Sequence, residues 1–232
     1  MIRLLKIIIF TLTFLSGLYL GIMIKEEPVA PSNNRKFELF SDIKLFQFEG
    51  KNLTSAQLQL NKVLLEIREK VIGDFYNEIK VFFDPNYSEI ETYTCGVALK
   101  CNVVQNTDKI FSCRIDTTQY HYGANGCLSN VIGVNYTIKE GKIRKIEFAE
   151  LFNSEIEKFT FLKNTLAKLK ILQDGKWVFM NTRELDDNDL LRFEKQLQFI
   201  VTEDKIKIMF PPYTIACGAC GILETEGDRP KK

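Results

Sequence analysis

The stretch Tyr93–Val104, YTCGVALKCNVV, decides the fold because its residues alternate strictly between two faces. One face carries Tyr93, Cys95, Val97, Leu99, Cys101 and Val103. This period of two is typical of a strand with one buried face. After a short polar segment, Ile110–Thr117 alternates as well, with Phe111, Cys113 and Ile115 together. The two stretches predict a β-hairpin folded about Thr107.

Such a hairpin places Cys101 opposite Cys113. Directly opposed strand residues can hold their Cβ atoms close enough for a disulfide, so Cys101–Cys113 is the preferred pair. The remaining cysteines are Cys95, Cys127, Cys217 and Cys220. They allow three pairings, and the sequence does not choose between them, although a link from Cys127 to the loop that holds Cys217 and Cys220 is favoured.

Helical patterns flank this hairpin. Residues 52–80 carry apolar side chains at three- and four-residue steps and predict a long helix, with Thr54 or Ser55 as its N-cap. Leu151–Leu172 predicts a second amphipathic helix. Asp186–Gln196 predicts a short charged helix whose first carboxylates favour the helix dipole rather than forming a catalytic pair.

Other stretches predict strands: FELFSDIKLFQF (residues 37–48), the hairpin around KEGK (residues 139–142), and the hairpin LQFIVT-EDKIKIMF (residues 197–210). Grouped strands between helices predict an α+β fold. In it, antiparallel β-hairpins form a sheet packed by two main amphipathic helices, preceded by one N-terminal transmembrane helix.

The transmembrane prediction rests on Ile7–Ile24, which contains no charged residue. As a helix this stretch reaches about 27 Å, enough to cross a thin bilayer core. Arg3 and Lys6 precede it and two glutamates follow, which places residue 1 in the cytoplasm. A cleaved signal peptide is the alternative, and either one exports the rest of the chain.

The expected organisation is a cytoplasmic segment (1–6), a signal anchor (7–24), a linker (25–36), an extracytoplasmic domain (37–226) and a tail (227–232). The domain has an N-terminal part (37–92) and a C-terminal part (93–226). We expect a single-pass protein of the cell membrane, with its domain in the periplasm or outside the cell.

The composition argues against several kinds of chemistry. Lys and Arg number 31 and Asp and Glu 30, so the charges nearly cancel and imply no overall attraction to nucleic acid. An even number of cysteines in an exported domain favours disulfides, so Cys217-Gly-Ala-Cys220 is interpreted as a staple rather than a redox pair. Because His121 is the only histidine, no catalytic triad, metal site or cofactor is predicted.

A succession of motifs adds a resemblance: YHYGANG (120–126), KEGK (139–142), LFNSEIEKFTFLKNTL (151–166), LQFIVTEDKIKIMF (197–210) and PPYTIACGACG (211–221). From Phe37 to Thr225 their order resembles an exported domain family. That family is found in the lysozyme-sensing anti-sigma factor RsiV and in the non-catalytic N-terminal region of the peptidoglycan deacetylase PdaC. Here Asn125 stands where that family carries histidine, and the cytoplasmic segment is too short to bind a sigma factor.

The resemblance implies a non-catalytic binding module whose ligand is a cell-envelope glycan such as peptidoglycan, or a lysozyme-like protein. Its expected binding residues lie in two loops: Tyr120, His121, Tyr122, Gly123, Asn125, Gly126, Pro212 and Tyr213. Two alternatives stay open. One is an accessory subunit of a larger membrane assembly, docked through the small residues Gly17 and Gly21. The other is an envelope hydrolase or a thiol oxidoreductase that uses Cys217 and Cys220.

Overall fold

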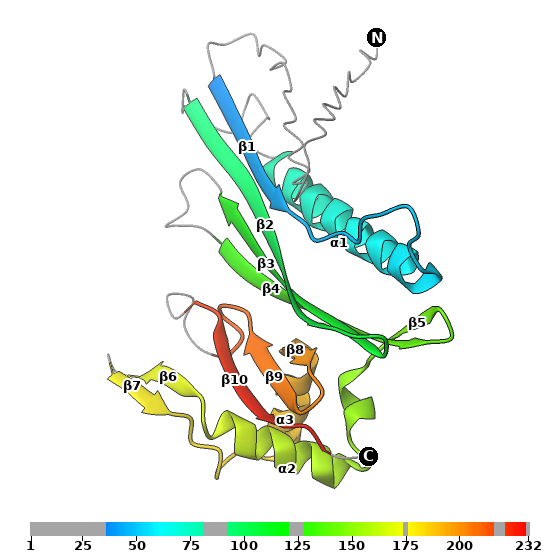
Figure 1. Ribbon diagram of the computed structural model, residues 1–232. Coiled ribbons are helices and arrows are strands. Elements are labelled where there is room, and N and C mark those ends of the chain that lie inside the picture. Colours follow the sequence, from blue (N-terminus) through cyan, green and yellow to red (C-terminus); the bar gives the residue numbers. More distant parts are fainter. Residues whose placement is uncertain (1–35, 81–91, 121–127, 174–175, 216–220, 231–232) are drawn as a thin grey trace. The chain divides into compact units, whose positions relative to one another are not determined.

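The computed structural model describes residues 36–80, 92–120, 128–173, 176–215 and 221–230 (Figure 1). The chain divides into two compact units. Unit 1 comprises Met1–Gln47, Leu64–Lys100 and Thr117–Leu128, and unit 2 comprises Phe48–Val63, Cys101–Asp116 and Ser129–Lys232. Within the described ranges, no helix has the length and apolar character needed to cross a membrane. The predicted anchor, residues 7–24, lies outside these ranges.

The described elements confirm a mixed α+β fold. In chain order they are β1 (Lys36–Lys44), α1 (Ser55–Ile79), β2 (Thr92–Asn106), β3 (Ile110–Tyr120), β4 (Leu128–Lys139), β5 (Lys142–Lys145), the 3-10 helix η2 (Phe148–Leu151), α2 (Glu155–Leu166), β6 (Lys170–Gln173), β7 (Lys176–Phe179), α3 (Asp187–Gln196), β8 (Gln198–Val201), β9 (Lys205–Phe210) and β10 (Leu223–Asp228). The strands form sheets in the orders β1-β2-β3-β4-β5, β10-β9-β8 and β6-β7.

The pairing of β1 with β2 departs from the expected hairpins. The two strands are parallel, with Lys36 opposite Thr92 and Lys44 opposite Lys100. The expectation of antiparallel pairing is wrong here because α1 connects the two strands. A helical crossover returns the chain to the end of the sheet where the first strand began, so the second strand runs in the same direction.

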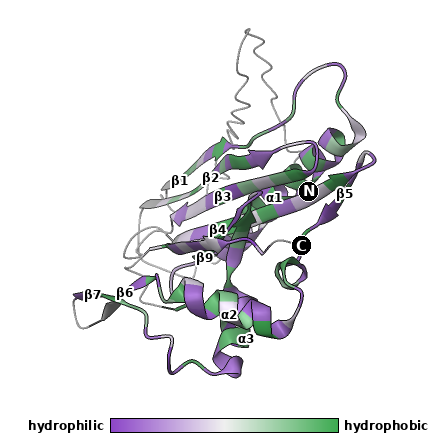
Figure 2. Ribbon diagram, turned by 60° about the horizontal axis from the view of Figure 1, so that its bottom comes forward, coloured by the Kyte–Doolittle hydropathy of each residue, from purple (hydrophilic) through white to green (hydrophobic). Residues whose placement is uncertain are grey.

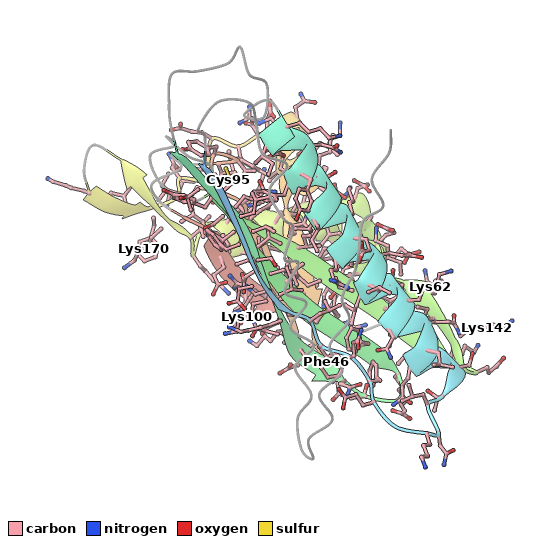
Figure 3. All side chains as sticks on the ribbon, turned by 90° about the horizontal axis from the view of Figure 1, so that it is seen from above. Phe46, Lys62, Cys95, Lys100, Lys142 and Lys170 are labelled. Carbon is pink, nitrogen blue, oxygen red and sulfur yellow. The ribbon has the colours of Figure 1, made fainter. Side chains whose placement is uncertain are left out.

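The long helix begins where the sequence predicts. The N–H of Thr54 donates to Gln57 Oε1 at 2.8 Å, and the N–H of Gln57 donates to Thr54 Oγ1 at 3.2 Å. This reciprocal pair is a capping box, so Thr54 is the N-cap. Further along α1, Phe75 and Ile79 pack with Cys95 and Val97 of β2 in the core of unit 1; Cys95 is labelled in Figure 3.

The alternation that predicted the first hairpin is confirmed by burial. Leu99 is 1% exposed, and Phe111, Cys113 and Ile115 are fully buried. The turn, however, comprises the three residues between Asn106 and Ile110 and is closed by the N–H of Thr107, which donates to the carbonyl of Ile110 at 2.9 Å. It is therefore centred one residue later than predicted.

The second hairpin is confirmed, and its turn explains the KEGK motif. Strands β4 and β5 pair with Lys139 opposite Lys142. The two residues between them, Glu140 and Gly141, have φ angles of 52° and 72°. A two-residue turn with positive φ at both positions matches the right-handed twist of its strands.

Unit 2 has an aromatic and aliphatic core. The ring of Phe148 lies 5.2 Å from that of Phe152 and 5.3 Å from that of Phe199, measured between centroids. Phe161 of α2 joins the same cluster. Figure 2 shows α2 with contrasting hydrophobic and hydrophilic bands, as expected for a helix with one buried face.

Two elements of unit 2 differ from the sequence prediction. The helix predicted for Leu151–Leu172 is shorter, because α2 ends at Leu166 and the chain continues into β6. Leu169 and Ile171 fit a strand period as well as a helical one, and short apolar runs do not distinguish the two. Strand β10 was not predicted, and its last residues, Gly227 and Asp228, fall in the segment expected to be a tail.

Strand β4 holds the edge of β8 through side chains. Asn135 is 3% exposed. Its Nδ2 donates to the Phe199 carbonyl at 2.7 Å, and its Oδ1 accepts from the Val201 N–H at 2.9 Å. Gly133 allows the close approach, since a Cβ at this position would lie 2.0 Å from the Phe199 carbonyl oxygen. The Asn135 amide thus makes the two hydrogen bonds to β8 that the backbone of a neighbouring strand would otherwise make.

A buried lysine joins α2 to α3. Lys158 is 3% exposed, and its Nζ lies 2.8 Å from Glu155 and 2.7 Å from Glu194. Burial lowers the pKa of Lys158, but hydrogen bonds to Glu155 and Glu194 outweigh it and leave the pKa above its usual value. Because the folded-state pKa is raised, this contribution to stability is complete at neutral pH and is lost only as the pH rises above the ordinary lysine range.

Replacing Glu194 with glutamine is expected to lower the free energy of unfolding by about 2 kcal/mol, because it leaves a buried ammonium with one exposed partner. Urea denaturation at neutral pH measures this. The matched control is Glu155→Gln, whose side chain is 65% exposed and which is expected to cost less than about 1 kcal/mol. Equal losses for the two variants would contradict the role given to Glu194.

Candidate functional site

The described residues include part of the predicted binding site. Tyr120 lies at the end of β3 in unit 1, and Pro212 and Tyr213 lie after β9 in unit 2. The other predicted binding residues, His121, Tyr122, Gly123, Asn125 and Gly126, lie outside the described ranges, as do Cys127, Cys217 and Cys220. Of the predicted binding residues, the structure therefore places only Tyr120, Pro212 and Tyr213.

The turn after β9 holds Tyr213 in an unusual conformation. Its φ is 67°, in the left-handed region, which costs a residue other than glycine about 1–2 kcal/mol. The turn is closed by Thr214, whose N–H donates to the Pro211 carbonyl at 3.3 Å and whose hydroxyl donates to the same oxygen. The side chain of Tyr213 is 75% exposed. The backbone thus adopts a costly conformation while the ring stays in solvent.

Tyr120 belongs to a different aromatic contact. Its ring centroid lies 6.3 Å from that of Phe40 on β1, and Phe40 is 51% exposed. The Phe40 ring lies across Gly96 of β2, since a Cβ at residue 96 would be 2.2 Å from Phe40 Cζ. An aromatic ring that covers a glycine on the next strand protects the sheet there, so this contact has a structural role in unit 1.

The preferred disulfide is not formed in this structure. Among the described residues, no disulfide joins Cys95, Cys101 or Cys113. Cys101 and Cys113 nevertheless lie within hydrogen-bonding reach of each other. Their side chains hydrogen-bond instead, and this bond, together with burial of Cys113, raises the pKa of the Cys113 thiol. A nucleophilic cysteine needs a lowered pKa, so this pair lacks the character of a redox centre.

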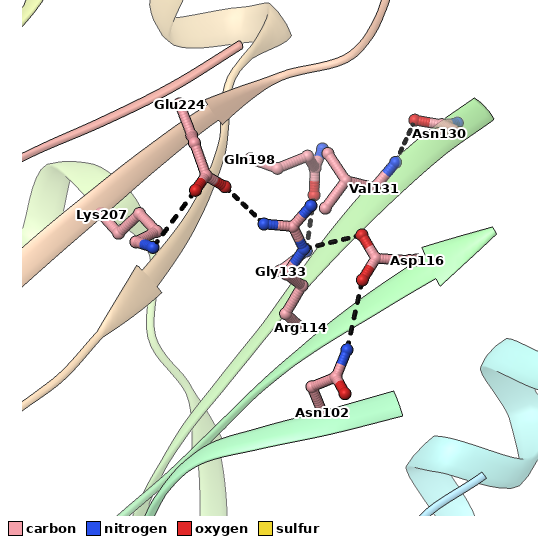
Figure 4. Close-up of polar contacts among 9 residues, drawn as sticks. All are labelled: Asn102, Arg114, Asp116, Asn130, Val131, Gly133, Gln198, Lys207 and Glu224. Carbon is pink, nitrogen blue, oxygen red and sulfur yellow. Dashed lines mark hydrogen bonds and ion pairs between the residues drawn. The ribbon is translucent and has the colours of Figure 1, made fainter. Parts of the chain in front are cut away.

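A polar network joins β3 to β10 within unit 2 (Figure 4). Arg114 Nε lies 2.7 Å from Asp116, and its Nη1 pairs with Glu224. Asn102 donates to Asp116 at 3.2 Å, and Lys207 lies 3.5 Å from Glu224. Burial lowers the pKa of Arg114, but its hydrogen bonds and ion pairs with Asp116 and then Glu224 outweigh this effect and leave the pKa above its usual value. Every charge in this network has a partner, which indicates a structural role.

Unit 2 also carries an open groove of about 1040 Å³. Its charged lining residues are Lys109, Glu150, Glu203, Asp204, Lys205, Asp228 and Arg229. Several are paired: Lys205 lies 2.6 Å from Asp228, which raises the pKa of Lys205 and lowers that of Asp228. Within the described ranges, no group of three or more His, Cys, Asp or Glu side chains is arranged to hold a metal ion. Because the groove is lined by both acidic and basic side chains, its charge favours neither an anionic nor a cationic ligand.

Sequence reasoning missed both the groove and the network of Arg114. Arg114 and Glu224 are separated by 110 positions, and neither belongs to a motif. Lys170, labelled in Figure 3, lies with its Nζ 5.1 Å from the ring centroid of Phe179, in a hairpin that also carried no recognised signal. Contacts of this kind depend on tertiary pairing and leave no local pattern.

Two crystal structures and one family model are similar to parts of this chain. A crystal structure of a DUF3298 family member from Bacteroides fragilis NCTC 9343 is 14% identical, with a TM-score of 0.42, over 72% of this chain and 65% of that one. A DUF3298 family protein from Pseudomonas aeruginosa PAO1 is 14% identical, with a TM-score of 0.37, over 56% and 57%. The chain thus spans less than two thirds of either structure. None of the curated proteins matches. Residues 149–226 match the family described as "Protein of unknown function (DUF3298)".

Proposed function

We propose that this chain is a membrane-anchored, extracytoplasmic binding module without catalytic activity, and that its ligand is peptidoglycan or a lysozyme-like protein. Residues 7–24 would anchor it, and the domain would face the periplasm or the exterior. The motif resemblance to the domain family of RsiV and PdaC supports the ligand class. The near balance of basic and acidic residues, with a formal net charge of +1, supports a neutral or mixed-charge ligand over nucleic acid.

The observation that carries the proposal is the conformation of Tyr213. Residues held in unfavourable backbone regions cluster at binding and active sites. Tyrosine offers a large, rigid contact surface with a polar tip, and it is enriched at the centres of interfaces. A ring that is 75% exposed contributes little to the core, so the cost of its left-handed backbone is unexplained by packing. Binding through this ring supplies a reason for it.

Replacing Tyr213 with glycine separates binding from stability. Glycine adopts a positive φ without strain, so the free energy of unfolding is expected to stay within about 1 kcal/mol of the wild type. Removal of the ring is expected to weaken binding by at least about tenfold, or 1.4 kcal/mol. The full chain in mild detergent is incubated with insoluble peptidoglycan and, separately, with immobilised lysozyme, and the bound fraction is measured across protein concentrations.

The matched control is Phe179→Ala, which removes another exposed ring, 62% exposed, from the same unit. It is expected to leave binding unchanged. If Tyr213→Gly binds as the wild type does, the loop after β9 is not the binding surface. If Phe179→Ala weakens binding equally, the weaker binding of Tyr213→Gly reflects a general loss of exposed apolar area and not a specific contact of Tyr213.

Export makes a separate prediction about Cys101 and Cys113. In an oxidising compartment the two hydrogen-bonded thiols would lose two protons and two electrons to a disulfide of the compartment's thiol-exchange system and form a bond. We expect protein isolated from the envelope, unfolded and alkylated before reduction and again after reduction, to show both cysteines protected from the first label. Labelling of both before reduction would contradict this pairing and would favour an unexported domain.

A further inference from the structure

A small cavity in unit 1 lies among α1, β1 and β2. Its volume is about 20 Å³, close to the room that one water-sized group requires. The walls include Leu39 and Ile43 of β1, Ile72 and Phe75 of α1, and Val97 of β2. These side chains are apolar, and Ser41 and Tyr76 add hydroxyl-bearing side chains to the lining. A group that enters this space therefore meets hydrocarbon on most sides.

Arg68 supplies the charge at this cavity. Its side chain is only 14% exposed, and its Nη1 lies 3.3 Å from Glu69, which is 64% exposed. Its Nε is buried and has no hydrogen-bond partner among the residues that the structure describes. A buried donor left unpaired destabilises the folded state. An acceptor that reaches Nε would recover this energy.

We propose that this cavity binds the carboxylate of an aliphatic monocarboxylic acid. A carboxylate can accept two parallel hydrogen bonds from one side of a guanidinium group, and such charge-assisted bonds are stronger than neutral ones. A phosphate is larger and more highly charged than an apolar space of about 20 Å³ admits. One carboxylate oxygen would occupy the cavity beside Arg68 Nε, while the second oxygen would bond the guanidinium at the mouth of the cavity and the rest of the ligand would lie outside.

The surface beside the cavity suits the alkyl chain. Phe40 also lines the cavity and is 51% exposed, so it offers apolar area to a chain that leaves the pocket. Covering such area contributes about 25 cal/mol per Å². The ligand class thus combines one negative charge with an apolar tail. All of these residues belong to unit 1, so the site does not depend on Tyr213.

The test is a titration of the full chain with octanoate, with octan-1-ol as the uncharged probe of equal length. The Arg68 Nε–H resonance is followed by NMR. We expect octanoate to shift this resonance saturably and octan-1-ol to leave it in place. In Arg68→Met the affinity for octanoate, followed through backbone amides of α1, is expected to fall at least about tenfold. The control Arg183→Met, at an exposed position, is expected to bind as the wild type does.

Two results would overturn the proposal. Equal shifts with octanoate and octan-1-ol would show an apolar cleft without carboxylate recognition. The second result is an Arg68→Met variant with a higher free energy of unfolding and unchanged octanoate binding. It would show that Arg68 Nε is only a destabilising unpaired donor and does not bind the ligand. Arg68→Lys retains the charge and loses the side-on pair of donors, so it is expected to bind octanoate more weakly than the wild type and more tightly than Arg68→Met.

Discussion

Replacing Gly133 with alanine is expected to lower the free energy of unfolding by about 3 kcal/mol or more. The added Cβ would lie 2.0 Å from the carbonyl oxygen of Phe199 and 2.9 Å from its backbone nitrogen. Backbone atoms cannot rotate away as a side chain can, so β4 and β8 would have to separate. That separation would also lengthen the bond from the Gly133 N–H to Gln198 Oε1, now 3.1 Å.

The measurement is urea denaturation followed by circular dichroism. The control is Gly73→Ala in α1, where a Cβ would have no neighbour within 4 Å. That variant is expected to gain about 0.5–1 kcal/mol, because alanine loses less conformational entropy in a helix. If Gly133→Ala were as stable as the wild type, the packing of β4 against β8 described here would be wrong.

Asn135→Leu is expected to be nearly as damaging. It retains most of the side-chain volume and removes both hydrogen bonds, leaving the Phe199 carbonyl and the Val201 N–H without their partner. Each such buried group costs about 1–3 kcal/mol. Urea denaturation measures the combined loss in the free energy of unfolding. The control Asn181→Leu replaces an exposed asparagine whose amide donates to Glu184 and accepts from the Arg183 N–H. It is expected to change stability by less than about 0.5 kcal/mol.

Asn135→Asp tests the same two hydrogen bonds through the pH dependence of the free energy of unfolding. The carboxylate keeps the acceptor for Val201 N–H but places a charge beside the Phe199 carbonyl, so burial would raise its pKa above the usual value for aspartate. A raised pKa in the folded state favours the protonated form, which can again donate to Phe199. The variant is therefore expected to approach wild-type stability as the pH falls, and a pH-independent difference would contradict this geometry.

Local signals in the sequence predicted the elements that depend on local physics. Thr54 and Asp186 are helix N-caps as expected, and in α3 the Asp186 side chain accepts from the Asp189 N–H at 2.8 Å. The pair Glu140–Gly141 forms the expected turn. Strict alternation gave the correct buried face of β2 and β3. In each case the residues that determine the structure lie within a few positions of one another.

Features that depend on distant pairing were missed. The parallel pairing of β1 follows from the helix between the strands, and β10 exists because its backbone pairs with β9, with Leu223 opposite Phe210. Asn135 matches a glycosylation pattern in the sequence, yet its amide is buried against β8. Of the candidate site, the turn at Tyr213 was predicted from its prolines, whereas the left-handed conformation of the tyrosine was not.

The most direct test of the proposed binding function is calorimetric titration of the oxidised full chain with lysozyme and then with solubilised peptidoglycan fragments. The account predicts saturable heat with at least one of them, with a Kd of about 10 μM or tighter, and loss of that heat in Tyr213→Gly. No heat with either ligand, from protein that denatures cooperatively, would contradict the account and would favour a subunit of a larger membrane assembly.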